Sequence, residues 1–293
     1  EHSSVTRTVR GMRRDLDWDC RYVDAPDGCF DMEQLAEQLQ DGPTSLISVM
    51  RVQNETGWIF PIPEIAQLRD ELAPGVPLHC DATQAFCKMP VNPREWGVQL
   101  LTAGAHKIGG PRGIGILYVQ RGLPMHTTAF GGNQERGLRS GTEPVFLAVG
   151  MAEAVRITAA HMETDMEYAA SLRERAIEGL KREIPDAVVH APEGGSPYIL
   201  SVSVPGLPNA VSVKYLSGRR VCVSRASACE ENHTTVAPGT WRPKHPLALQ
   251  AAGIPLREGK ETLRASFFHR NTPEDVDRFV AVLAQCAREM RES

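Results

Sequence analysis

Two side chains, Asp81 and Lys107, are of the types that hold a reactive aldehyde cofactor. Asp81 follows one short apolar run of the chain, and Lys107, preceded by His106, follows the next. Pyridoxal phosphate requires an amine that forms a Schiff base with its aldehyde, and a carboxylate that keeps its pyridine nitrogen protonated so that the ring accepts electrons. The pair therefore predicts a pyridoxal phosphate site in which Lys107 supplies the amine and Asp81 the carboxylate.

Each of these residues also has a simpler interpretation. The tetrapeptide DATQ at residues 81–84 is typical of a helix start, with Asp81 as the N-cap and Gln84 completing a capping box. Asp81 could be a helix N-cap and the partner of the pyridine nitrogen at the same time. Lys107 could be a surface lysine beside the glycine-rich turn of residues 109–115. A buried lysine at a strand end suits a Schiff base, and we favour that interpretation.

The elements that must position these residues are indicated by short apolar runs. Buried strands are predicted at residues 45–50, 76–80, 99–103 and 115–119, with a helix over 63–72 between the first two. Strands that alternate with helices imply an α/β fold with a mainly parallel sheet. Such sheets bind ligands beyond the carboxyl ends of their strands, where Asn54, Asp81 and Lys107 are expected.

The second half of the chain predicts a smaller α/β domain. A long helical pattern covers residues 145–184 and is closed by Pro185. Strands are then predicted at 198–204, 220–224 and 262–268, followed by a helix over 273–290 that Thr272 caps. We therefore predict a large domain at residues 1–151 and a small domain at 152–293.

Composition excludes several classes of protein. The 293 residues are 42% hydrophobic and 23% charged, with a formal net charge of -4, as expected of a soluble globular protein rather than a nucleic-acid binder. The seven cysteines include no CxxC pair or zinc-type spacing, so we expect reduced thiols and no metal site. No apolar run approaches the roughly 20 residues of a membrane helix, and the expected location is the cytoplasm.

Seven short motifs occur in a fixed order along the chain. They are EH (1–2), NETG (54–57), DATQ (81–84), HK (106–107), QERGLRSGTE (134–143), SRASAC (224–229) and LRASF (263–267). In these motifs the chain resembles the cysteine desulfurases of the NifS and IscS type, within the aminotransferase class V family. The resemblance implies fold type I of the pyridoxal phosphate-dependent transferases. It also implies that the chain lacks the N-terminal segment of such enzymes, which carries a phosphate-binding turn.

The resemblance implies an activity as well: conversion of L-cysteine to L-alanine, with a persulfide left on Cys229. It assigns a role to each matching position. His2 would stack on the cofactor ring and relay protons, Asn54 and Arg264 would bind the substrate carboxylate, and Asn54 would also contact the cofactor. Gln84 would face the phenolic oxygen of the cofactor, and His106 would contact its phosphate. Thr142, in a loop with Arg139 and Gly141, would reach the phosphate of a partner subunit, which implies a homodimer.

Cys229 is the cysteine that we expect to be reactive. It follows small residues and precedes the polar, Gly- and Pro-containing stretch of residues 230–246, a composition typical of a mobile loop. A cationic neighbour such as Arg225 or His233 would favour its thiolate, whereas Glu230 and Glu231 would oppose it. The other six cysteines are interpreted as incidental, because cysteine often packs as a small apolar residue.

Two positions depart from the pattern of the resembling enzymes. Gly104 stands where they have a phosphate-binding serine, and Thr102 is a candidate for replacing the lost hydrogen bond. Phe268 stands where a glycine is common.

Other functions remain open from the sequence. Another class V aminotransferase or a selenocysteine lyase would need Lys107 and Asp81 without necessarily using Cys229. A noncatalytic or partner-complemented fragment of the same fold is a further alternative. If the chain is a desulfurase, the resemblance implies transfer of sulfur to an acceptor such as an iron-sulfur scaffold or a tRNA-thiolating enzyme.

Overall fold

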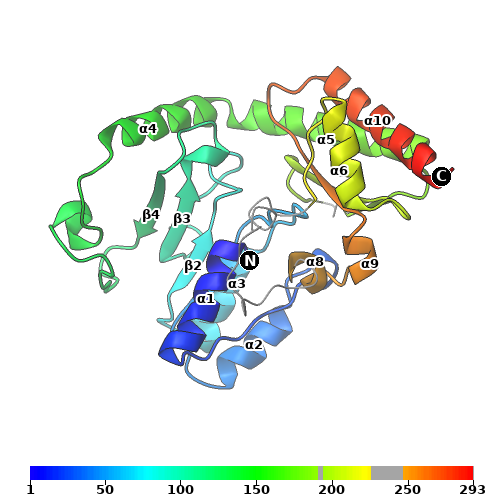
Figure 1. Ribbon diagram of the computed structural model, residues 1–293. Helices are drawn as coiled ribbons and strands as arrows, with labels where there is room; N and C mark the ends of the chain where they lie inside the picture. Colours follow the sequence, from blue (N-terminus) through cyan, green and yellow to red (C-terminus); the bar gives the residue numbers. More distant parts are fainter. Residues whose placement is uncertain (191–193, 226–246, 293) are drawn as a thin grey trace. The chain divides into compact units, whose positions relative to one another are not determined.

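Two units, each built around its own sheet, make up the computed structural model (Figure 1). The structure describes residues 1–190, 194–225 and 247–292. The unit that we call the parallel-sheet unit comprises Leu39–Arg51 and Pro61–Met162. The antiparallel-sheet unit comprises Glu1–Gln38, Val52–Phe60 and Glu163–Ser293. These units differ from the sequence ranges predicted as domains, so the division at residues 151 and 152 stays a prediction.

The sheet of the parallel-sheet unit has the strand order β1-β2-β3-β4. Its strands are β1 (Ile47–Met50), β2 (Leu78–Asp81), β3 (Leu100–Gly104) and β4 (Gly115–Val119). β1, β2 and β3 are parallel, and β4 is antiparallel to β3. The four predicted strands and the mainly parallel sheet are therefore confirmed.

The two faces of this sheet differ in polarity because successive side chains of a strand point to opposite faces. One face carries buried apolar residues, namely Ile47, Val49, Leu78, Cys80, Leu101 and Ala103. The polar face carries Ser48, His79, Asp81 and Thr102. In the strand register Ser48 lies next to His79, and Asp81 lies next to Thr102. Polar groups of three strands thus meet on one face, near the carboxyl ends of the strands.

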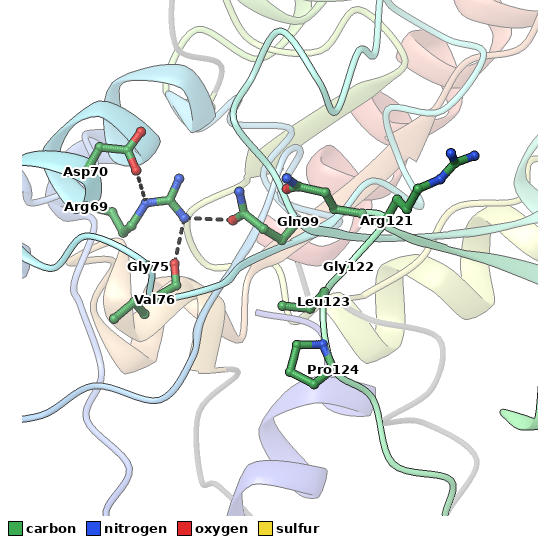
Figure 2. Close-up of a pocket in the computed structure, with 10 residues that line it drawn as sticks. Arg69, Asp70, Gly75, Val76, Gln99, Arg121, Gly122, Leu123 and Pro124 are labelled. Carbon is green, nitrogen blue, oxygen red and sulfur yellow. Dashed lines mark hydrogen bonds and ion pairs between the residues drawn. The ribbon is translucent and has the colours of Figure 1, made fainter.

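Helix α3 (Ile62–Leu72) connects β1 to β2 and confirms the predicted helix. Its Arg69 is 2% exposed and donates to the carbonyl oxygens of Val76 and Gly97, at 2.7 and 2.9 Å, and to Gln99 Oε1 at 2.7 Å. Its Nε lies 2.7 Å from a carboxylate oxygen of Asp70 (Figure 2). A buried guanidinium is stable only with such partners. Arg69 therefore ties α3 to the segments that enter β2 and β3.

A cavity of about 340 Å³ opens beside Arg69 (Figure 2). It is lined by residues that precede β2 and β3 and by Gln120, Arg121, Gly122, Leu123 and Pro124, which follow β4. Since β4 is antiparallel, all of these segments lie at the amino-terminal edge of β2 and β3. Asp81 and Lys107 lie at the carboxyl ends of these strands, so the cavity lies at the opposite edge of the sheet.

The predicted helix over residues 145–184 is two helices, α4 (Val145–Ala160) and α5 (Met162–Glu183). α4 ends at His161, whose amide donates to the carbonyl oxygen of Thr158. The prediction of one continuous helix is therefore wrong at this residue. Among the described residues, no single helix is long and apolar enough to cross a membrane, although α4 and α5 pass that test as a bent pair, by length and composition only.

The sheet of the antiparallel-sheet unit has the order β5-β6-β7. Its strands are β5 (Val188–Val189), β6 (Ile199–Ser203) and β7 (Thr262–Ser266), so the predicted strands at 198–204 and 262–268 are confirmed. The strand predicted at 220–224 is wrong. Arg220 has φ +61° and Val221 donates back to the carbonyl oxygen of Leu216, so this stretch is the end of a helix, and only Ser224 forms an isolated bridge.

Helices of this unit include several that the apolar pattern did not predict. They are α1 (Ser3–Leu16), α2 (Met32–Gln40, which continues into the other unit), α6 (Asn209–Gly218), α8 (Leu247–Ala251) and α9 (Leu256–Gly259). The predicted C-terminal helix is confirmed as α10 (Pro273–Arg291), with Thr272 and Asp275 forming a capping box. Its buried apolar face, including Phe279 and Leu283, packs within this unit, where α10 contacts α6.

Candidate active site

Asp81 is the last residue of β2, and its carboxylate lies at the predicted place. The residue is 7% exposed, and its Oδ1 accepts a hydrogen bond from the amide of Thr83 at 2.9 Å. In the described parts of the chain Asp81 forms no ion pair. The predicted helix start is wrong, because the residues after β2 form turns and Cys87 has φ +54°. Asp81 is therefore a buried carboxylate at the carboxyl end of a strand.

Lys107 follows the neighbouring strand in a short 3-10 turn, η2 (Ala105–Lys107). The carbonyl oxygen of Ala105 accepts the amides of Ile108 and Gly110 at 3.1 and 3.0 Å. A Cβ at position 110 would lie 2.9 Å from the Cβ of Ala105, so the tight turn requires a glycine there. Lys107 is half-buried. The turn places it just beyond the carboxyl end of β3, as predicted.

Positive charge gathers around His106. Desolvation lowers the pKa of this imidazole, and the charges of Lys107, Arg112 and Lys88 lower it further. The imidazole also occupies the space next to Gly104, since a Cβ added there would lie 2.9 Å from two of the ring atoms. The departure from serine at position 104 is thus accompanied by a histidine ring in the place of the serine side chain.

The remaining predicted residues of the parallel-sheet unit are Gln84 and Thr142. Gln84 is half-buried, and its Oε1 accepts from Nζ of Lys88 at 3.3 Å. Thr142 is exposed in the loop that precedes α4. This loop follows the 3-10 turn η3 (Gln134–Gly137) and is held by the amide of Gly141, which donates to Gln134 Oε1 at 3.2 Å.

Asn54 and Arg264 lie together in the antiparallel-sheet unit. Nη1 of Arg264 donates to the backbone oxygen of Asn54 at 2.7 Å. Asn54 is 5% exposed, and its side-chain oxygen is buried with no hydrogen-bond partner among the described residues. Buried polar atoms are normally paired, so this oxygen is an acceptor available to a ligand. The two residues predicted to bind a substrate carboxylate are thus in contact.

The segment that leads to Cys229 is attached to Arg264. Ser224 and Arg264 exchange two backbone hydrogen bonds, at 3.0 and 2.7 Å. Cys229 itself lies outside the described residues. Its predicted role as the sulfur-accepting nucleophile therefore stays a prediction.

His2 is the N-cap of α1 in the antiparallel-sheet unit. Its Nδ1 accepts the amide of Ser4 at 3.1 Å and lies 2.8 Å from the hydroxyl of the same residue. This structural role was not predicted, because serine, threonine and aspartate are the side chains that usually mark an N-cap. Its predicted stacking on a cofactor ring stays a prediction.

The sequence analysis missed a hydrogen-bonded row on the polar face of the parallel sheet. Ser48 Oγ lies 2.8 Å from Nδ1 of His79, and Nε2 of the same ring lies 3.1 Å from Thr102 Oγ1. Because Thr102 is part of this row, its predicted role as a substitute phosphate ligand gains no support. The signal in the sequence was a polar residue, Ser48, His79 or Thr102, among the apolar residues of each of three strands.

The chemistry of these groups fits pyridoxal phosphate. Asp81 offers a buried carboxylate without an ion pair in the described residues, which suits a protonated ring nitrogen. The cations around His106 suit a phosphate. The described residues therefore include donors and acceptors for the ring and the phosphate of this cofactor.

Comparison with known sequences matches almost the whole chain. A cysteine desulfurase of Nostoc sp. is 33% identical over 266 residues, which cover 90% of this chain and 63% of that protein. Cysteine desulfurase IscS of Clostridium botulinum is 30% identical over 296 residues, covering 100% of this chain and 71% of that protein. The chain thus spans less than two thirds of the length of the Nostoc relative.

Solved structures match the fold. A NifS-like protein superposes with a TM-score of 0.84 at 29% identity, covering 97% of this chain and 72% of that chain. DndA from Streptomyces lividans gives a TM-score of 0.72 at 29% identity, covering 92% of this chain and 73% of that chain. A structure described as SspA in complex with cysteine gives a TM-score of 0.72 at 26% identity, covering 93% of this chain and 72% of that chain.

The fold and the placement of Asp81 and Lys107 define a class of protein, the fold type I pyridoxal phosphate-dependent transferases. The sequence profile of the family described as aminotransferase class-V matches residues 1–279. The chain belongs to this family.

Proposed function

We propose that this protein is a pyridoxal phosphate-dependent cysteine desulfurase. The observation that carries the proposal is the placement of Asp81 and Lys107 after adjacent parallel strands, in a chain that matches cysteine desulfurases in sequence. The curated relatives that support it are enzymes of greater length. The activity of the longer proteins is therefore proposed for this chain.

The chain's own residues would hold the cofactor by charge and hydrogen bonding. Pyridoxal phosphate supplies an electrophilic aldehyde and an electron-accepting ring when it is bound. We assign the aldehyde to the amine of Lys107, the ring nitrogen to Asp81, the phenolic oxygen to Gln84 and the phosphate to His106. Desolvation and the charges of Lys107, Arg112 and Lys88 lower the pKa of His106, and a neutral imidazole can still donate a hydrogen bond to the phosphate.

The substrate carboxylate is assigned to Arg264 and Asn54. A guanidinium offers two parallel hydrogen bonds to a carboxylate, and Nη1 of Arg264 is already oriented by the backbone oxygen of Asn54. The amine of Lys107 would move a proton from the α-carbon of cysteine. His2 and Thr142 are retained as proposed contacts of the cofactor ring and of a partner subunit's phosphate.

The proposed reaction transfers one sulfur atom to the protein. The thiol of Cys229 forms a sulfur-sulfur bond with the substrate sulfur, and the carbon-sulfur bond of cysteine breaks. The β-carbon gains a proton, so that the products are L-alanine and a persulfide on Cys229. We propose that the persulfide sulfur passes to an acceptor protein, such as an iron-sulfur scaffold or a tRNA-thiolating enzyme in the cytoplasm.

We further propose a homodimer, supported by apolar side chains that the parallel-sheet unit exposes. On α4, Phe146 is 78% exposed and Val149 is 63% exposed, and Phe130 is exposed as well. Large exposed apolar surface is typical of protein interfaces. Light scattering is expected to give twice the chain mass for the parent and the chain mass for Val149→Glu. A parent that stays monomeric at tens of micromolar would contradict the dimer.

Cofactor binding is the first test of the proposed function. The parent chain with added pyridoxal phosphate should develop visible absorbance, and borohydride should fix the cofactor to the peptide that contains Lys107. Lys107→Ala should lose this label, whereas the control Lys181→Ala, on the exposed surface of α5, should keep it. A colourless parent that resists labelling would favour a noncatalytic fragment.

Sulfur transfer is the second test. With cysteine as substrate, the parent should release alanine and carry a persulfide that is absent from Cys229→Ser. The matched control is Cys222→Ser, which removes an exposed thiol close to Cys229 in the sequence. Persulfide on Cys229→Ser would refute the nucleophile. Alanine release from selenocysteine by that variant would instead identify a selenocysteine lyase.

A further inference from the structure

The imidazole of His79 lies between two hydroxyl groups on the polar face of the parallel sheet. Nδ1 is 2.8 Å from Ser48 Oγ on β1, and Nε2 is 3.1 Å from Thr102 Oγ1 on β3. Each ring nitrogen therefore has a partner on a different neighbouring strand. The orientation of the ring is fixed by three strands at once.

This row is joined to Asp81 through side chains and backbone. Asp81 stands two residues after His79 on β2, so both side chains project from the same face. The carbonyl oxygen of Thr102 accepts the amide of Ala82, and that of Asp81 accepts the amide of Arg51, both at 2.9 Å. Thr102 thus contacts His79 with its hydroxyl and holds the backbone next to Asp81 with its carbonyl.

The partners of His79 suit a neutral ring. One nitrogen of a neutral imidazole donates and the other accepts, and a hydroxyl can serve in either role. Burial lowers the pKa of His79, and the opposing influence of the Asp81 carboxylate is the smaller of the two. In the described residues, Asp81 is the charged group that acts on this ring. A protonated ring would place a cation beside the carboxylate and compete with any other cation for it.

We propose that His79 is a positioning residue for Asp81: hydrogen-bonded on both sides, its ring ties β1, β2 and β3 together beside the strand end whose carboxylate would pair with the ring nitrogen of pyridoxal phosphate. The inference rests on the proposed function, because it takes Asp81 as the partner of that nitrogen. It assigns His79 no chemical step. At metal sites, residues that orient the ligating side chains change affinity by about 10- to 100-fold, and we expect an effect at the lower end of that range here.

The test compares His79→Phe, which keeps a ring without hydrogen bonds, with His79→Gln, which keeps a neutral hydrogen-bonding side chain. Thr102→Val removes one hydroxyl from the row and leaves the imidazole, so it serves if His79→Phe does not fold. The control is His190→Gln, which removes a half-buried histidine bonded to Ser203 at 2.6 Å in the other unit. Measurements on the full chain are the Kd for pyridoxal phosphate, the pH titration of the visible absorbance, and kcat and KM for cysteine.

His79→Phe should raise the Kd about tenfold and shift the midpoint of the absorbance titration. It should lower kcat while KM for cysteine stays within about twofold, because Arg264 and Asn54 are untouched. His79→Gln should recover most of the affinity, Thr102→Val should change it in the same direction by less, and His190→Gln should match the parent. A folded His79→Phe, or Thr102→Val in its place, with the parent's Kd and titration curve overturns the role of His79 alone. A parent that binds no pyridoxal phosphate overturns both proposals.

Discussion

Replacing Asp81 by asparagine separates a structural role from a cofactor role, because only the cofactor role needs the charge of the carboxylate. Asparagine has the same shape, and its side-chain oxygen can still accept the Thr83 amide that Asp81 binds at 2.9 Å. The substitution therefore removes the charge and little else. A buried carboxylate without an ion pair costs stability, whereas a neutral amide in the same place costs less.

The magnitudes follow from this comparison. The cofactor-free Asp81→Asn chain should match or exceed the parent's free energy of unfolding, by up to about 1 kcal/mol. A hydrogen bond to a charged group is worth about 1.5 to 3 kcal/mol, so pyridoxal phosphate should bind roughly 10- to 150-fold more weakly.

Two assays on the same preparation decide the matter. Urea unfolding of the cofactor-free chain gives the change in stability, and a visible absorbance titration with pyridoxal phosphate gives the Kd. The control is Glu95→Gln, which neutralises an exposed carboxylate of the same unit. If Asp81→Asn keeps the parent's Kd for pyridoxal phosphate, Asp81 is a turn residue only and the reasoning is refuted.

Three further predictions concern stability and the phosphate end of the site. Gly104→Ser must displace the His106 ring, since its Cβ would lie 2.9 Å from that ring, so it should cost about 1 kcal/mol in urea unfolding and weaken pyridoxal phosphate binding severalfold; tighter binding would contradict this. Arg69→Met should lower the free energy of unfolding in urea by about 3 to 5 kcal/mol, because it leaves the buried acceptors of the Arg69 guanidinium without a donor. A decrease of less than about 1 kcal/mol would show that those acceptors find other partners. Burial lowers the pKa of His79 and His190 in the folded chain, so the unfolded chain binds protons at a higher pH, and the free energy of unfolding should fall as the pH drops below about 6.5. Between pH 7 and pH 5 the thermal midpoint of His190→Gln should therefore fall less than that of the parent. An equal fall in both proteins would exclude His190 as a cause.

Much of the fold could be predicted because apolar runs identify buried strands directly. All four strands of the parallel sheet and two of the antiparallel sheet lie where such runs were found. The errors have local causes. The stretch at 220–224 is apolar enough for a strand but turns at Arg220, and the break before Met162 involves neither glycine nor proline. Helix α1 was not predicted, and its N-cap is a histidine rather than one of the usual capping residues.

The candidate site was predictable only in part. Asp81 and Lys107 could be placed from the order of strands and helices, since residues after parallel strands share an edge. The row through His79 could not, because it depends on which residues pair across three strands, and register is not visible in one strand alone. The contact of Arg264 with Asn54 joins residues far apart in the chain, and the motifs indicated their roles but not that contact.

The anchoring of the amino-terminal edge of the parallel sheet by Arg69 bears on how this chain could evolve. Arg69 holds the segments that lead into β2 and β3 through hydrogen bonds to carbonyl and amide oxygens, and neither Asp81 nor Lys107 takes part in these bonds. Substitutions can then accumulate at the other edge without loosening the scaffold beneath them. New substrate preferences could be selected there while the framework is inherited unchanged.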